Sequence, residues 1–134
     1  MPSQLSRIHR VRTLQLTLAR AEEARANAQV ASEQALCARI AQLTETATSA
    51  SGSATTLLAA SHYRERLNKS AVVAANRVRQ AEAEATRAAE GACAAERDQS
   101  AVEKLMARAR AEALRREMRA LEDAPFPRKR HDLC

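Results

Sequence analysis

The chain has 134 residues, yet its aromatic residues are limited to Tyr63 and Phe126, and much of its apolar content is alanine. Because such side chains bury little area, the composition excludes a compact layered core and favours long helices or a coiled coil. The formal net charge of +6 permits binding to nucleic acid, anionic membranes or acidic protein surfaces without choosing among them.

The first predicted helix spans residues 4–48 and has a divided apolar pattern. One stripe comprises Leu5, Ile8, Val11, Leu14, Leu18 and Ala21, and a second comprises Leu36, Ile40, Leu43 and Ala47. Between them the expected packing residues shrink to Ala24, Ala28, Ala31 and Ala35. We expect all of these residues to face the second helix.

A turn is predicted at about residues 49–55, because the segment TSASGSATT is small, hydroxylic and centred on Gly52. Serine and threonine compete for local backbone hydrogen bonds, and glycine readily ends a helix. Ser53 or Thr55 is expected to cap the helix that follows. A connection this short makes the two helices antiparallel neighbours.

The second predicted helix spans residues 56–122 and carries the clearest pattern in the chain. Alternating steps of three and four residues form a seam that is apolar except at Arg64, Gln99 and Arg116: Leu57, Ala60, Arg64, Leu67, Ala71, Ala74, Val78, Ala81, Ala85, Ala88, Ala92, Ala95, Gln99, Val102, Met106, Ala109, Ala113, Arg116 and Ala120. A spacing of 3.5 residues held this long predicts a left-handed coiled coil with a closely approaching partner helix. The fold class is therefore predicted to be an all-α, two-helix antiparallel coiled-coil hairpin in a single domain.

The predicted helices differ in length, so part of the second helix has no partner within the hairpin. Folding the chain about Gly52 places the start of the first helix near residue 100 and leaves residues 101–123 unpaired. This end keeps the seam and adds a second apolar stripe, namely Ala107, Ala111, Leu114, Met118 and Leu121. Such a helix usually packs on another molecule. Self-association, or an error of several residues in the boundaries, is the alternative explanation of the pattern.

Two residues of the second helix interrupt its regular composition. Tyr63 flanks the seam near the turn, where it is expected to be at least half exposed. It serves either as packing over the neighbouring helix or as an external contact. Gly91 weakens a helix by roughly 1 kcal/mol relative to alanine, and we expect it to mark a bend.

The sequence contains no constellation that supports catalysis. It has no glycine-rich phosphate loop, no HExxH motif and no serine nucleophile elbow, and its three histidines are isolated. The HDLC ending offers a weak metal site on a tail, residues 123–134, that is expected to be mobile. We therefore expect no enzyme activity, no cofactor and no metal.

The three cysteines do not form a disulfide framework, and Cys37 and Cys93 are expected to lie at different heights in the hairpin. No run is apolar enough to cross a bilayer, so the protein is expected to be cytoplasmic and not membrane-spanning. Arginines gather near both chain ends, which makes one tip of the rod positive. A basic coiled coil that binds nucleic acid, or a homodimeric structural scaffold, is therefore the alternative to the function suggested next.

The chain resembles the FliJ family of flagellar export stalk proteins and its YscO-like counterparts in virulence type III secretion. The features that carry this resemblance are the long hairpin with a longer second helix, the basic segment RIHRVRTLQLTLARAEE, the step HYRERL after the turn and the end VEKLMARARAEALRREMRALED. The resemblance implies a non-enzymatic stalk, cytoplasmic and peripheral at the inner-membrane export apparatus. Its partners would be a hexameric export ATPase, the membrane export gate and export chaperones.

The resemblance also implies two groups of contact residues. The residues expected to dock in the ATPase come from the two terminal segments, namely Arg7, Arg10, Arg12, Met106, Arg110, Leu114, Met118 and Leu121. The residues expected to contact the export gate lie early in the second helix, namely Tyr63, Leu67, Ser70 and Ala74. Leu67 and Ala74 also belong to the seam, so they would share that contact with helix packing.

Overall fold

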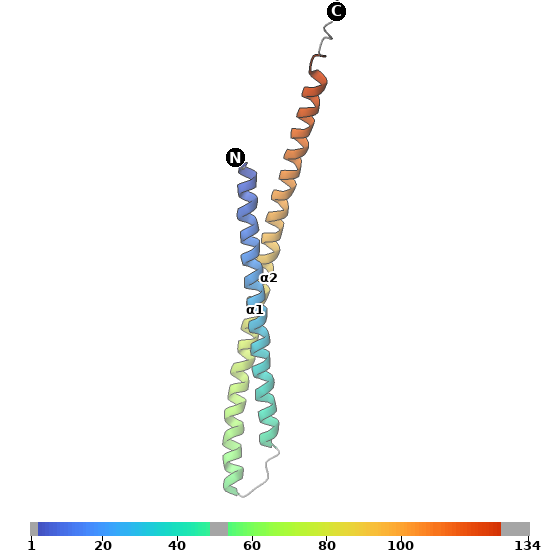
Figure 1. Cartoon of the computed structure of the whole chain (residues 1–134). Coiled ribbons are helices and arrows are strands. Elements are labelled where there is room, and N and C mark those ends of the chain that lie inside the picture. The colour runs from blue at the N-terminus through green and yellow to red at the C-terminus, as the bar shows by residue number, and fades with distance from the viewer. Residues whose placement is uncertain (1–2, 49–53, 127–134) are drawn as a thin grey trace, which may run out of the picture.

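The structure, a computed structural model, describes residues 3–48 and 54–126 and consists of two helices. Helix α1 spans Gln4–Thr48 and helix α2 spans Ala54–Asp123. The helices run antiparallel and pack against each other along α1, and α2 continues well beyond the start of α1 (Figure 1). This arrangement confirms the all-α two-helix hairpin with a longer second helix.

The helix ends follow local chemistry. Ser3 caps α1, because its side-chain Oγ accepts a hydrogen bond of 3.2 Å from the backbone amide of Ser6. Helix α2 begins at Ala54, so Thr55 is helical and the prediction that it caps α2 is wrong. The helix ends at Asp123, shortly before Pro125. The predicted cap Ser53, most of the predicted turn and residues 127–134 of the predicted tail lie outside the described residues.

The predicted α2 seam is confirmed over the paired part of the hairpin. Each seam position from Ala60 to Met106 is buried or half-buried. The buried residues of α2 all belong to it, namely Leu67, Ala74, Ala81, Ala92 and Val102. Alanine at so many of these positions lets α1 approach closely along most of its length.

The face of α1 that packs on α2 agrees with the prediction at Leu5, Ile40, Leu43 and Ala47 and differs from it between Leu5 and Ile40. Its buried and half-buried residues repeat in steps of three and four: Leu5, His9, Arg12, Leu16, Ala19, Glu23, Ala26, Val30, Glu33, Cys37, Ile40, Thr44 and Ala47. The expected packing residues Ile8, Val11, Leu14, Leu18, Ala21, Ala24, Ala28, Ala31, Ala35 and Leu36 are exposed instead. A helix stays in contact with the α2 seam only if its contact residues keep a constant average spacing of 3.5 residues. Alternating steps of three and four residues back from Ile40 lead to Leu16 and His9, not to Leu14 and Leu18.

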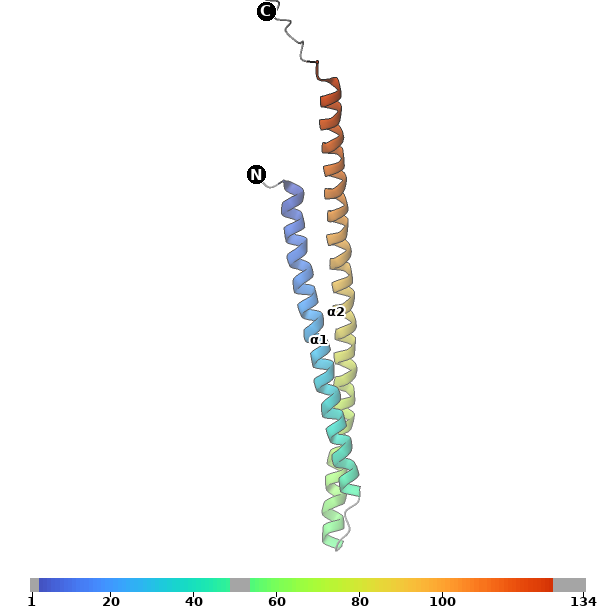
Figure 2. The ribbon, with the colours of Figure 1, turned by 45° about the vertical axis from the view of Figure 1, so that its right-hand side comes forward.

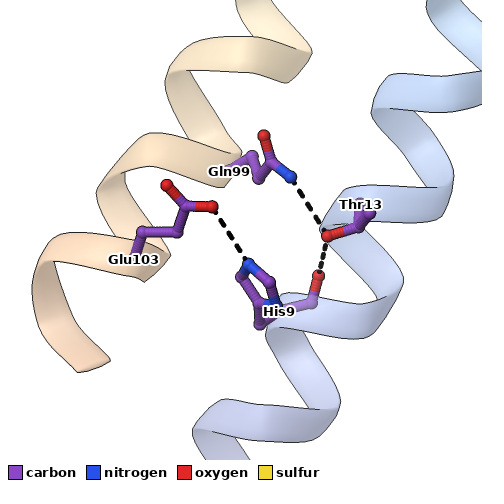
Figure 3. Close-up of polar contacts among 4 residues, drawn as sticks. All are labelled: His9, Thr13, Gln99 and Glu103. Atoms are coloured by element: carbon purple, nitrogen blue, oxygen red, sulfur yellow. Dashed lines mark hydrogen bonds and ion pairs between the residues drawn. The ribbon is translucent and has the colours of Figure 1, made fainter. Parts of the chain in front are cut away.

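The two halves of the hairpin are held together by different contacts. Near the turn, Ile40 packs against Leu67 and Ala74 in the apolar cluster of the paired helices. Towards the N-terminus polar contacts accompany the buried Leu16 and Val102, and Figure 3 shows the side chain of His9 beside that of Glu103, with His9 Nε2 3.2 Å from a carboxylate oxygen. In the same view Gln99 donates a hydrogen bond of 3.1 Å to the hydroxyl of Thr13 (Figure 3).

The pairing register also differs from the prediction. His9 lies opposite Glu103, and Glu33 lies opposite Arg77, so the midpoint of the pairing falls near residue 55 instead of Gly52. The start of α1 therefore reaches beyond residue 100 of α2, and Val102 is buried in the hairpin. Met106 is the last half-buried residue of α2, so the fully exposed end begins after Met106, not at residue 101. Figure 2 shows this end of α2 projecting past α1 from a second direction.

Candidate docking surfaces

The unpaired end of α2, residues 107–123, is here called the C-terminal overhang. Every residue in it is exposed, including the whole second stripe that the sequence predicted. Its large apolar side chains Leu114, Met118 and Leu121 are 55–76% exposed. Their spacing of four and three residues places them on one face of the helix. The overhang is thus a helix with an uncovered aliphatic face.

The overhang is also rich in charge. It carries five arginines among four acidic residues, namely Arg108, Arg110, Glu112, Arg115, Arg116, Glu117, Arg119, Glu122 and Asp123. The ion pairs of the described residues all lie in the paired part of the hairpin or near the turn, so these charges face solvent. Leu114 and Met118 therefore lie in a strongly hydrated surface that mixes both signs of charge.

The residues expected to dock in the ATPase divide into two groups. Arg7, Arg10, Arg110 and the three large apolar residues of the overhang are exposed. Arg12 is engaged within the hairpin, because its guanidinium donates hydrogen bonds of 3.2 Å to Asp98 and 3.1 Å to Gln15. Met106 is half-buried and shares a shallow hollow with Leu5 and Arg110. The structure thus places Arg12 and Met106 in the hairpin contact.

The residues expected to contact the export gate divide in the same way. Leu67 and Ala74 are buried in the apolar cluster around Ile40. Ser70 is exposed, and Tyr63 is 46% exposed on the same part of α2. Of the four residues, Tyr63 and Ser70 are therefore the ones with exposed side chains that a partner protein could contact. The role of all four in gate contact stays a prediction.

Ser70 belongs to a shallow groove between the helices that the sequence did not reveal. The groove has a volume of about 420 Å³, with Ile40 and Ala74 among its lining residues. Leu36 contributes from α1 and Val73 from α2, and both are exposed. Lys69 and Arg77 also line the groove, and they form ion pairs with Glu65 and Glu33. The adjacent pair Val72-Val73, exposed on an otherwise alanine-rich helix, was the available sequence signal.

The described residues hold no cluster typical of metal binding. Within residues 3–48 and 54–126, no group of three or more histidine, cysteine or acidic side chains is placed to hold a metal ion. Cys37 and Cys93 are both free thiols, as expected from their separation. Over the same ranges, neither helix combines the length and apolar character that crossing a membrane requires. His131 and Cys134 lie outside the described residues.

Comparison with known proteins identified no relative. No protein-family model matches the chain, and searches of curated proteins and of solved structures returned no significant match.

Proposed function

We propose that the chain is a non-enzymatic stalk of a type III protein export apparatus, flagellar or virulence-associated, that docks in a hexameric export ATPase. The observation that carries this proposal is the C-terminal overhang. It comprises about 25 Å of helix after Met106, at 1.5 Å per residue, and its first residues Ala109, Arg110 and Ala113 line a hollow with Leu5 of α1. A single helix with an uncovered aliphatic face and many charges suits insertion into the central pore of a ring.

The hairpin body supports the same function by acting as a rigid handle. The paired seam runs from Ala60 to Met106, so the two helices form a long rod from which the overhang projects. The opposite end of the rod carries Tyr63 and the groove beside Ser70. In this proposal that end faces the membrane export gate, while export chaperones are further partners.

The decisive experiment is binding of the purified chain to the export ATPase encoded in the same genome. The variant Leu114→Gln/Met118→Gln/Leu121→Gln removes the aliphatic face of the overhang and leaves the seam intact. We expect binding to fall by at least tenfold, because each buried aliphatic side chain contributes roughly 1.5–3 kcal/mol. Truncation after Met106 should abolish binding while the paired seam is retained.

The matched control is Leu57→Gln/Leu58→Gln/Val72→Gln, which changes exposed aliphatic residues near the turn. This variant should bind the ATPase as the wild-type chain does. Circular dichroism would establish that both variants remain helical. Undiminished ATPase binding by the overhang variant, or by the chain truncated after Met106, would contradict the docking assignment.

A further inference from the structure

A second uncovered apolar surface lies near the other terminus, on α1. It consists of Ile8, Val11, Leu14 and Leu18, here called the α1 outer stripe, whose members are 39–65% exposed. The neighbouring residue Leu16 is buried against α2. Because α1 presents Leu16 and His9 to α2, the outer stripe turns away from the hairpin seam. Four aliphatic side chains thus form an apolar surface that α2 does not cover.

The charges around the outer stripe are of one sign. Between Gln4 and Ala21 the sequence contains four arginines and no acidic residue, and Glu22 is the first acid. Two of these arginines are occupied in the hairpin, since Arg12 pairs with Asp98 and Arg20 lies 3.9 Å from Glu96. The other two, Arg7 and Arg10, are exposed and belong to no ion pair among the described residues.

The positions of the free arginines match the outer stripe. Arg7 lies seven residues before Leu14, and Arg10 lies one residue before Val11. Arg7 and Leu14 therefore share the outer face of the helix, while Arg10 lies at its margin. An arginine on such a face can lay its aliphatic stem along apolar surroundings and keep its guanidinium at a polar boundary.

From this placement we propose that the α1 outer stripe binds the surface of an anionic membrane. An aliphatic face that carries arginines and meets its first acid, Glu22, only one turn beyond Leu18 has the chemistry of a helix that lies in the headgroup region. Nucleic acid would use the arginines but would gain nothing from four exposed aliphatic side chains. Since the stripe faces away from the seam, α1 can rest on the bilayer with α2 on its solvent side. The inference does not depend on the C-terminal overhang or on the proposed stalk function.

The test is co-sedimentation of the full chain with vesicles of phosphatidylcholine containing one quarter phosphatidylglycerol. We expect binding to these vesicles, weaker binding at high salt and little binding to pure phosphatidylcholine. Arg7→Gln/Arg10→Gln should lower the affinity by about fivefold for each arginine, on the order of thirtyfold together. Leu14→Gln/Leu18→Gln should lower it by at least about tenfold, since both side chains leave the apolar phase.

The chain offers a closely matched control for the leucine variant. Leu58 and Val72 are 65% and 63% exposed, compared with 59% and 65% for Leu14 and Leu18, but they lie near the turn. The variant Leu58→Gln/Val72→Gln should bind the anionic vesicles as the wild-type chain does. Absence of binding to anionic vesicles, or binding that the outer-stripe variant retains in full, would overturn the proposal. An equal loss of binding in Leu14→Gln/Leu18→Gln and in Leu58→Gln/Val72→Gln would also overturn it, because binding would then not be located on α1.

Discussion

Arg77 donates a hydrogen bond of 3.0 Å to the carboxylate of Glu33, which is only 5% exposed in the contact between the helices. Gln29 donates a second hydrogen bond, of 2.9 Å, to the same oxygen. The other carboxylate oxygen of Glu33 is buried and has no hydrogen-bond partner in the structure. The buried carboxylate of Glu33 thus receives hydrogen bonds at only one of its two oxygens.

Removing Arg77 should destabilise the hairpin more than removing Glu33. Arg77→Met leaves a buried carboxylate with Gln29 as its remaining donor, and we expect a loss of about 1–2 kcal/mol because water can partly replace the half-exposed guanidinium. Glu33→Leu removes the buried charge and frees Arg77 to be hydrated, so stability should be unchanged or increased. Urea unfolding followed by circular dichroism measures both. A larger loss for Glu33→Leu than for Arg77→Met would contradict this interpretation.

The alanine seam should tolerate no larger side chain. Ala81 is buried between the helices, so Ala81→Leu forces them apart and should cost about 1–3 kcal/mol. Ala83, two residues away, is exposed, and Ala83→Leu should change stability by less than about 0.5 kcal/mol. Thermal unfolding of the two variants compares the same substitution inside and outside the seam. Equal effects would show that the α2 seam is not the contact surface.

Gly91 should be replaceable by alanine with a gain in stability. It lies within α2, and a Cβ atom added there would meet no other atom within 4 Å. Gly91→Ala should therefore stabilise the hairpin by up to about 1 kcal/mol, the difference in helix propensity. The reverse change at an exposed position, Ala83→Gly, should lower stability by a similar amount. A loss of stability in Gly91→Ala would mean that another helix packs closely against Gly91, which is not the case in this hairpin.

Tyr63 should contribute little to the stability of the hairpin. Because it is 46% exposed and lies outside the apolar cluster, Tyr63→Ala should cost less than about 1 kcal/mol and leave the helix content unchanged. In the proposed function, the same variant should retain ATPase binding and lose contact with the export gate. Urea unfolding provides the first measurement. A cost above about 3 kcal/mol, typical of a buried aromatic residue, would instead make Tyr63 a packing residue.

The α2 seam could be predicted from the sequence because its 3.5-residue spacing is continuous and almost free of polar interruptions. The α1 seam could not, because its true contact face includes His9, Glu23 and Glu33, while the aliphatic residues Leu14 and Leu18 face outwards. A pattern search that follows the largest apolar side chains selects the wrong face in that half of α1. Cross-helix polar contacts such as Gln99 to Thr13 depend on three-dimensional placement that periodicity does not contain.

The candidate docking surfaces could be predicted in part for the same physical reason. Exposure of Leu114, Met118 and Leu121 follows from the difference in helix length, which the positions of Gly52 and Pro125 indicate. Where the unpaired end begins depends on the register, and the position of the predicted turn alone does not determine which residues face each other. Pairs such as Glu33 with Arg77 define that register, and they appear only once both helices are placed.

The central claim is that one stalk occupies the pore of one ATPase ring. Native mass spectrometry of the chain mixed with the export ATPase tests it directly, because the mass of the complex reports the number of chains bound to each hexamer. We expect one chain per hexamer, and loss of this species in the variant truncated after Met106. A complex with as many chains as ATPase subunits, or no complex with the intact chain, would contradict it.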